Sequence, residues 1–193
     1  MPLPHHQNSQ AGRNKFEPVH NNIFEIVFTI PEALRNEFGA DEQLLSEQVV
    51  KITGLDNINK GPSIVTQKFM GTTRSYLAPK LDDTSIQFEV EFNLNLRGEN
   101  KVDDYTYKLL RAWNKLGYNM ETGETTLKED YLAEWFKITI ANREGTIHRE
   151  IILKDVMMYE GLSGLDDLDW TSNDPKTITA KFASDWTMPE RNA

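Results

Sequence analysis

Cysteine is absent from this chain of 193 residues, and its absence removes several kinds of chemistry at once. The chain has no disulfide framework, no thiolate metal site and no cysteine nucleophile, as suits a reducing cytoplasm. Histidine is also scarce, since only His5, His6, His20 and His148 occur. The stability of the fold must therefore come from packing.

Long apolar runs and an excess of positive charge are missing as well. No stretch approaches the roughly 18 to 20 apolar residues of a membrane helix, and residues 1–8 lack the apolar segment of a signal peptide. We therefore expect a soluble protein without a membrane partner or a signal for export. The net charge of -9 argues against a binder of duplex DNA, which needs clustered cations. This charge indicates either that DNA is irrelevant to the protein or that DNA slides past its surface without sticking.

What is present describes one ordinary folded domain, with 38% hydrophobic and 10% aromatic residues. A chain of this length buries roughly 70% of its unfolded surface in one core. Residues 1–21 are rich in Pro, Gln, Asn and His and have little apolar periodicity, which predicts a flexible N-terminal arm. Residues 22–193 are then a single domain.

Alternation of apolar and polar residues predicts strands along most of this domain. The clearest case is Ile86 to Leu96, where one face is apolar and the other carries Glu89 and Glu91. At about 3.3 Å per residue this strand would span roughly 36 Å. Further strands are predicted over residues 23–30, 48–55, 135–141, 146–159 and 176–186, with a turn at 142–145 and a loop at 161–164. Residues 63–79, with a turn at Gly71-Thr72-Thr73, predict a long projecting hairpin with an exposed polar tip.

One substantial helix is predicted after Asp103, which is placed to cap it, and Gly117 is placed to end it. Its apolar stripe indicates core packing rather than a cofactor site and consists of Tyr105, Leu109, Trp113 and Leu116. Residues 32–43 predict a single helical turn ended by Gly39, and Thr126 with Glu129 predicts a capping box before a short helix. The fold class is therefore mainly β, an antiparallel sandwich or partly closed barrel with one flanking α-helix.

The candidate chemical sites are weak. His5-His6 lacks further metal ligands, and a lone strand histidine such as His148 is usually structural. The acidic stretch 166–174 fails the calcium-loop test, because Ser172 and Ile178 stand where an EF-hand needs Gly and Glu. A solvated acidic turn is the better interpretation.

Carboxylate pairs and glycine-rich loops give no stronger signal. Glu89 and Glu91 lie about 7 Å apart on one strand face, inside the range of an inverting glycosidase, but strand alternation produces such pairs constantly. The segment 160–164 lacks the Lys-Ser/Thr ending of a phosphate loop. We predict no catalytic residue, no cofactor, no metal and no enzyme activity.

Several segments, taken in order, resemble the tail tube proteins of contractile-tailed bacteriophages. Asn22 to Ile26 resembles the strand that opens that domain. The middle segment is Lys68-Phe69-Met70-Gly71 with Arg74, Tyr76, Ala78 and Pro79, followed by the alternating strand. The most specific segment runs from Ile151 to Val156 through Gly161 to Leu168-Asp169-Trp170, Asn173 and the strand Lys176 to Trp186. The similarity covers residues 22–188 and departs at 32–43 and 118–134.

This resemblance implies a non-enzymatic virion protein with the phage tail tube fold. Its hexameric rings would pair their strands into a continuous inner barrel and stack head to tail as the conduit for DNA ejection. The implied partners are further copies of the chain, the tail sheath protein, the tape measure protein in the lumen, and the baseplate and tail terminator proteins. Assembly would take place in the host cytoplasm, and DNA would pass without specific binding. A closed ring also uses exposed strand edges that would otherwise pair without control.

The resemblance also implies two sets of site residues. The hairpin segment expected to reach the neighbouring ring contains Phe69, Met70, Gly71, Arg74 and Tyr76. Glu89 and Glu91 are candidates for the face that lines the lumen.

Three other hypotheses stay open on the sequence alone. The first is the tube protein of a bacterial contractile injection system, which shares the fold and the ring. The second is a small-ligand-binding barrel of lipocalin type, in which apolar strands enclose a cavity. The third is a glycosidase that uses Glu89 and Glu91.

Overall fold

The computed structural model describes residues 23–38, 42–55, 58, 64–77, 85–96, 103–165, 174–187 and 191–192. The elements are β1 (Phe24–Phe28), α2 (Glu32–Phe38), α3 (Glu42–Glu47), β2 (Val49–Thr53), β3 (Ile64–Phe69), β4 (Thr72–Leu77), β5 (Ile86–Asn93), α4 (Tyr105–Gly117), α5 (Lys128–Tyr131), β6 (Ala133–Ala141), β7 (Ile147–Ser163), β8 (Thr177–Thr187) and β9 (Arg191–Asn192).

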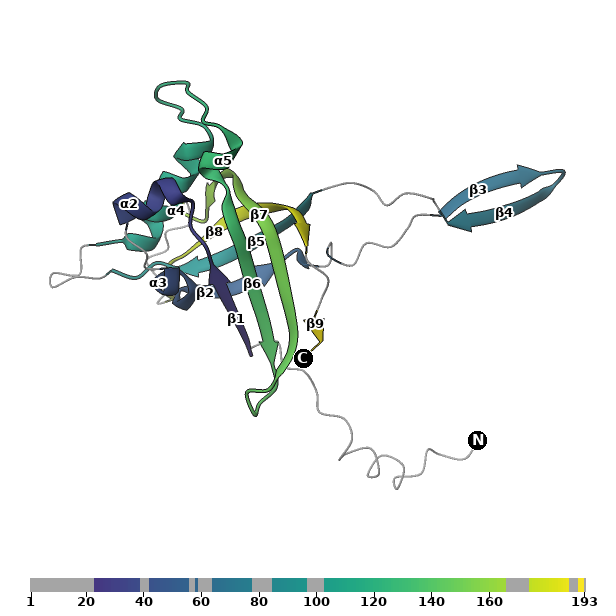
Figure 1. Ribbon diagram of the computed structural model, residues 1–193, viewed down its shortest axis with the longest axis horizontal. Coiled ribbons are helices and arrows are strands. Elements are labelled where there is room, and N and C mark those ends of the chain that lie inside the picture. The colour runs from purple at the N-terminus through teal and green to yellow at the C-terminus, as the bar shows by residue number, and fades with distance from the viewer. Residues whose placement is uncertain are drawn as a thin grey trace.

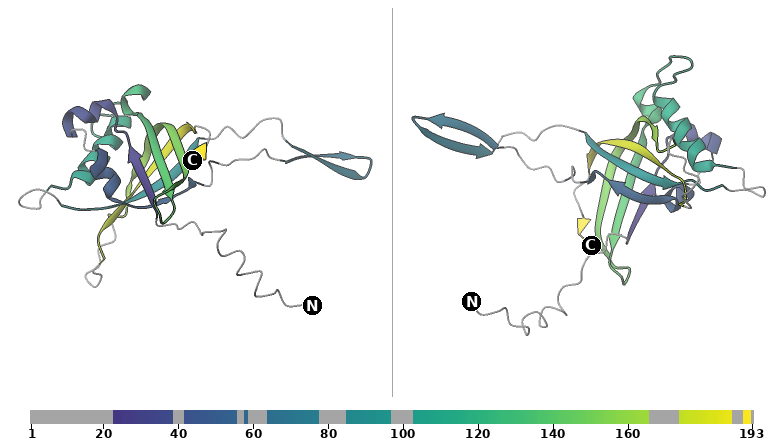
Figure 2. Two further views of the ribbon diagram at one scale, coloured as in Figure 1. Left: turned by 60° about the horizontal axis from the view of Figure 1, so that its bottom comes forward. Right: turned by 180° about the vertical axis from the view of Figure 1, so that it is seen from behind.

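A seven-stranded antiparallel sheet forms the body, in the order β1-β6-β7-β8-β5-β2, with β9 paired to β7. The sheet curves into a partly closed barrel, and its two end strands are β1 and β2 (Figure 1). The helices gather at one side of this barrel, and the separate hairpin β3–β4 projects from the other side (Figure 2). The predicted mainly β class is confirmed.

An aromatic cluster fills the inside of the barrel beneath α4. The Trp113 ring lies 6.0 Å from Phe136 and 5.5 Å from Phe182, and those two rings are 5.2 Å apart. Phe88 stacks on Phe182 at 5.6 Å, and Phe28 meets Phe136 edge to face at 4.6 Å. Edge and offset contacts at these separations add to the stabilisation that apolar burial provides. These side chains occupy the space where a lipocalin-type barrel would hold its ligand.

The predicted apolar stripe of α4 is confirmed, but its cap is not. Tyr105, Leu109 and Trp113 are buried, and Leu116 packs against the core. The N-cap is Asp104, whose carboxylate accepts a hydrogen bond of 3.3 Å from the Tyr107 amide. The predicted cap, Asp103, instead forms an ion pair of 2.9 Å with Lys108. The helix begins at Tyr105, so the residue directly before it supplies the capping oxygen.

The predicted capping box of α5 is also displaced. The Thr126 hydroxyl donates a hydrogen bond to the Leu116 carbonyl instead of capping α5. The residue before the helix is Leu127, and its amide donates to the Asp130 carboxylate at 3.3 Å. The short helix is therefore present, with its reciprocal bond one residue further along the chain.

Residues 32–47 are more helical than predicted. The single expected turn is a seven-residue helix, α2, which buries Leu34. A second helix, α3, occupies residues that carried no helical prediction, and its Leu45 is fully buried. Burial of one leucine by each short helix fixes them against the barrel, since neither is long enough to be stable alone.

Strand β5 keeps the predicted alternation but ends at Asn93, not at Leu96. Its partner β8 begins at Thr177, which pairs with Asn93, so the ladder ends there except for a bond of 2.9 Å from the Leu94 amide to the Lys176 carbonyl. Leu96 is exposed. The length of the partner therefore sets the end of the strand.

Strand β7 corrects the predicted loop at 161–164, because it continues to Ser163. The register with β8 shifts between Tyr159 and Ser163, where Glu160 has a φ of 59°. Between these two pairs β7 contains two more residues than β8, and a bulge of this kind increases the local twist and bends the strand. The chain thus curves around the barrel instead of leaving it.

A second irregularity of β7 lies at Asp155, which has a φ of 51°. Leu153 and Val156 are both buried although they are three residues apart, so the alternation of faces is reset at this point. The indole nitrogen of Trp186 donates a hydrogen bond of 3.0 Å to the Asp155 carboxylate. This contact from β8 helps to hold the left-handed residue in place.

Thr29 joins the end of β1 to β6 through two side-chain hydrogen bonds. Its hydroxyl donates to the Trp135 carbonyl at 2.7 Å and accepts from the Trp135 amide at 2.9 Å, and the residue is buried. We expect Thr29→Val to lower the free energy of unfolding by about 1–3 kcal/mol, because the partly buried Trp135 amide loses its side-chain acceptor. Urea unfolding measures this loss.

Thr139→Val is the matched control for this prediction, because Thr139 lies half-buried on the outer face of β6. We expect it to change the stability by no more than about 0.5 kcal/mol. Equal losses in the two variants would contradict the role assigned to Thr29.

Candidate assembly surfaces

The hairpin β3–β4 lies outside the barrel and has no core of its own (Figure 1). Its two strands pair from Ile64 with Leu77 to Phe69 with Thr72, and the described side chains of both strands are exposed. An isolated two-stranded hairpin is marginally stable in water. The exposed apolar residues at its base therefore indicate a surface that another molecule covers; they are Ile64, Val65, Tyr76 and Leu77.

The predicted projecting hairpin is present, but its turn is Met70-Gly71 and not Gly71-Thr72-Thr73. Met70 has a φ of 37° and Gly71 a φ of 82°, as a two-residue loop of type I′ requires at both positions. The Met70 side chain is fully exposed, at 105% of its reference area. The tip is exposed, as predicted, but its turn carries an apolar side chain among mostly polar neighbours.

The hairpin differs in charge from the rest of the chain. Residues 64–77 contain Lys68 and Arg74 but no acidic residue, in a chain whose net charge is -9. Lys68 and Arg74 lie at neighbouring cross-strand positions, opposite Thr73 and Gln67 respectively, so they project from opposite faces near the tip. The tip thus combines one exposed apolar side chain with two cations.

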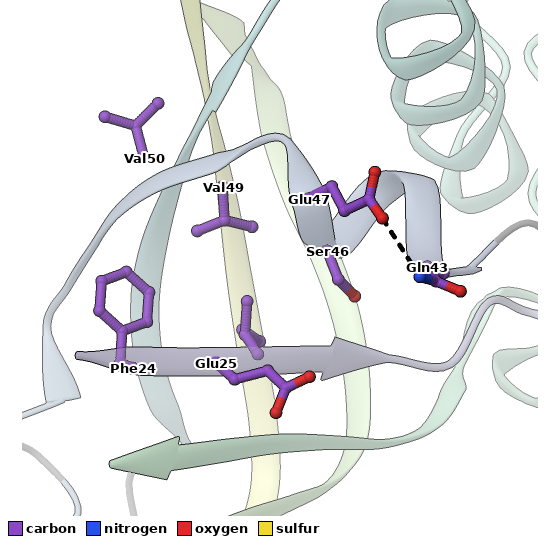
Figure 3. A pocket seen from close by; sticks show the side chains of 8 residues that line it. Phe24, Glu25, Gln43, Ser46, Glu47, Val49 and Val50 are labelled. Atoms are coloured by element: carbon purple, nitrogen blue, oxygen red, sulfur yellow. Dashed lines mark hydrogen bonds between the residues drawn. The ribbon is translucent and has the colours of Figure 1, made fainter. Parts of the chain in front are cut away.

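A pocket of about 610 Å³ lies where the two end strands of the sheet approach α3 (Figure 3). Its apolar lining comes from β1 and β2 and comprises Phe24, Ile26, Val49 and Val50. Its acidic lining comprises Glu25 of β1 and Glu47 of α3, both of them exposed. The Gln43 amide donates a hydrogen bond of 3.2 Å to the Glu47 carboxylate.

Sequence reasoning did not find this pocket. Its walls come from strands at opposite ends of the sheet order and from a helix of six residues, and no local pattern joins them. The one available signal was the acidic residue at the centre of an otherwise apolar run, Phe24-Glu25-Ile26.

The predicted lumen candidates, Glu89 and Glu91, both project from β5 on the face opposite the core, as the alternation predicted. Glu89 lies 3.8 Å from Lys181 of β8, which also binds Glu160 of β7 at 2.7 Å. The hydrogen bond to Glu160 raises the pKa of Lys181. Glu91 lies opposite Thr179 of β8 and Lys51 of β2. Each glutamate therefore has a lysine directly opposite it on one neighbouring strand, and this face carries charges of both signs.

Burial by neighbouring side chains raises the pKa of Tyr159, which continues the same row from β8 onto β7. The row Glu89–Lys181–Tyr159 therefore crosses three strands on the outer face. A row of neighbouring side chains across three strands can help to fix the register of those strands.

Other candidate sites are placed as follows. His148 is exposed on β7. Within the described ranges, no three His, Asp or Glu side chains are grouped so as to hold a metal ion. None of the helices in the described part of the chain combines the length and apolar character that a membrane crossing requires. The arm 1–21, Ala78-Pro79 and the acidic stretch as far as Asn173, with its Asp169-Trp170 pair, lie outside the described residues.

Comparison with known proteins shows that this chain is similar in fold to several solved structures. The sequence matches no protein-family model and no curated protein sequence. A solved chain from the sheath-tube complex of an extracellular contractile injection system, PVC, in its extended state matches with a TM-score of 0.57 and 13% identity, covering 96% of this chain and 97% of that one. A chain from the tube-terminating cap of the anti-feeding prophage matches with a TM-score of 0.56 and 10% identity, covering 92% and 93%. A chain from the PVC sheath/tube terminator matches with a TM-score of 0.53 and 10% identity, covering 92% and 99%.

These matches extend over nearly the full length of both chains, so the likeness concerns the whole arrangement and not one motif. The chain has a tail-tube-like fold of the kind found in contractile injection systems. The solved examples are parts of injection particles, and none of these three is described as a bacteriophage tail.

Proposed function

We propose that this chain is a structural, non-enzymatic subunit that forms hexameric rings, which stack into the inner tube of a contractile injection particle. The observation that carries the proposal is an exposed hairpin on a barrel of tail-tube-like fold. A heterologous contact between neighbouring copies of such a barrel can close into a ring by rotation.

The hairpin is the proposed stacking element between rings. The residues assigned to it are Phe69, Met70, Gly71, Arg74 and Tyr76. The exposure of Met70, Arg74 and Tyr76 supports this assignment, because residues that pack within their own chain would be covered. Glu89 and Glu91 remain the proposed lumen face, and each lies opposite a lysine of a neighbouring strand, Lys181 and Lys51 respectively.

The partners follow from the proposed tube. They are further copies of the chain, a sheath protein outside the tube, a tape measure protein inside it, and baseplate and terminator proteins at its ends. The likeness to chains of a sheath-tube complex and of a sheath/tube terminator supports this set.

A phage tail tube that conducts DNA is the second candidate. The ordered resemblance of residues 22–188 to phage tube proteins and the net charge of -9 favour it, since an acidic lumen repels phosphate. The solved neighbours favour the injection system. Purified particles would separate the two, because only a phage carries a DNA-filled capsid.

Negative-stain electron microscopy of the purified protein, combined with sedimentation, tests the proposed function. We expect rings of uniform diameter, or tubes built from them, at high protein concentration. A chain that sediments as a monomer at every concentration, with or without its baseplate partners, would contradict the tube and favour a small-ligand-binding barrel.

Removal of residues 71–75 tests the role of the hairpin. We expect rings to form but tubes to be short or absent, because the deletion leaves the seven-stranded sheet intact. We expect Arg74→Ala to shorten the tubes as well. The control is Lys115→Ala, which removes an exposed cation from α4, where it forms an ion pair of 3.2 Å with Glu121. Tubes of normal length in the deletion variant would exclude the hairpin as the stacking element.

A further inference from the structure

The hairpin tip and the pocket between β1, α3 and β2 are complementary in charge. The tip carries Lys68 and Arg74 without an acidic residue, and the described lining of the pocket contains Glu25 and Glu47 without a basic one. Complementary charges of this kind favour the correct encounter and disfavour the wrong partners. We therefore expect the cationic tip to bind beside these two glutamates.

The two surfaces are also complementary in their apolar parts. Met70 stands at the tip with its side chain fully exposed. The pocket offers it the side chains of Phe24, Val49 and Val50, of which Val50 is 44% exposed. Methionine is flexible and fills irregular apolar spaces well. A volume of about 610 Å³ is large enough for this side chain with part of the flanking strands.

The two surfaces lie on different sides of the molecule. The hairpin projects from one side of the barrel, and α3, which borders the pocket, lies with the other helices on the opposite side (Figures 1 and 2). A contact between two different surfaces of identical subunits is heterologous, and it continues from copy to copy when the surfaces face apart. The hairpin is therefore placed to reach a second copy and not its own pocket.

We propose that the pocket between β1, α3 and β2 is the receptor for the hairpin tip of a second copy of this chain. In this contact Met70 lies against the apolar lining, and the tip cations lie beside Glu25 and Glu47. The inference rests on the proposed tube, in which the hairpin joins neighbouring rings, and it adds the surface to which the hairpin binds.

Disulfide crosslinking tests the contact without background, because the chain contains no cysteine. One preparation carries Val50→Cys in the pocket, and a second, distinguished by a longer tag, carries Thr73→Cys near the hairpin tip. Both positions are exposed, and both variants keep the proposed charge pairs. The control pocket variant is Thr125→Cys, in the exposed loop between α4 and α5. After mixing and mild oxidation, we expect the Thr73→Cys chain to form a disulfide-linked heterodimer with the Val50→Cys chain but not with the Thr125→Cys chain.

Charge reversal tests the chemistry of the same contact. Adding Lys68→Glu and Arg74→Glu to the Thr73→Cys chain should lower the yield of the heterodimer by about tenfold, since attraction becomes repulsion. Adding Glu25→Lys and Glu47→Lys to the Val50→Cys chain should restore it. Circular dichroism of each variant controls for folding.

The outcomes separate this inference from the proposed function. Rings or tubes that form while Thr73→Cys fails to crosslink to Val50→Cys, or crosslinks equally to Thr125→Cys, would overturn the receptor pocket and leave the tube standing. A selective crosslink without rings or tubes would support the pocket and contradict the tube. A monomer without any crosslink would contradict both.

Discussion

Replacement of Trp113 by alanine is expected to lower the free energy of unfolding by about 3–5 kcal/mol, a large part of the stability of a typical domain. The indole is 1% exposed and lies between Phe136 and Phe182, so its removal opens a cavity at the junction of α4 and the sheet. Its nitrogen also donates a hydrogen bond of 2.9 Å to the Tyr131 carbonyl, which would lose this donor. Denaturant unfolding measures the loss.

Two further variants separate packing from hydrogen bonding. Trp113→Phe keeps an aromatic ring in the cluster but removes the donor to Tyr131, so we expect a smaller loss than for alanine. Trp186→Ala is the matched control, because that indole is 48% exposed and bonds to Asp155 at the surface. We expect it to cost about 1 kcal/mol. Similar losses for Trp113→Ala and Trp186→Ala would show that the cluster under α4 does not dominate the core.

Sequence patterns predicted those elements in which one local rule determines the outcome. The alternation from Ile86 placed Phe88, Val90 and Phe92 inside and Glu89 outside, because each strand residue faces opposite to the next. The spacing of Tyr105, Leu109 and Trp113 likewise placed one face of α4 against the sheet. The hairpin was predicted because polar strands around a glycine have no buried face.

The elements that escaped prediction depend on residues distant in sequence. Asp155 and Glu160 adopt positive φ within β7, and neither is the glycine that would mark such a position in a sequence. Helix α3 has only six residues, too few for a helical period to be recognised, and tertiary burial of Leu45 holds it. The pocket needs α3 and both end strands of the sheet in place. For this reason the sequence predicted the hairpin of the proposed contact but not the pocket that would receive it.

Replacement of Gly54 by alanine is the second change with a large expected effect. Gly54 has a φ of 88°, and a Cβ atom there would lie 2.8 Å from the Gln87 carbonyl oxygen and 3.0 Å from the Phe88 Cα. Both contacts are with the backbone of β5, which cannot move aside as a flexible side chain would. The unfavourable φ costs about 1–2 kcal/mol and the overlap about 1–3 kcal/mol, so we expect a combined loss of about 2–5 kcal/mol in denaturant unfolding.

Gly145→Ala is the matched control for this strain. Gly145 has a φ of 81° in the turn between β6 and β7, with no atom within 4 Å of its added Cβ. It therefore reports the cost of the left-handed backbone alone, about 1–2 kcal/mol. If the two variants lose the same stability, the close approach of Gly54 to β5 does not contribute.

The two glycines should also differ in their effect on assembly. Gly54 directly follows β2, which pairs with β5 alone among the described strands and supplies Val49 and Val50 to the pocket. Relief of the overlap at Gly54 requires β2 to shift from β5, which would displace one wall of the pocket. We therefore expect Gly54→Ala to lower the heterodimer yield between Val50→Cys and Thr73→Cys under conditions in which the protein remains folded, whereas Gly145→Ala leaves it unchanged. An unchanged yield in both would mean that the position of β2 does not matter to the hairpin, and the receptor would then have to lie elsewhere on the barrel.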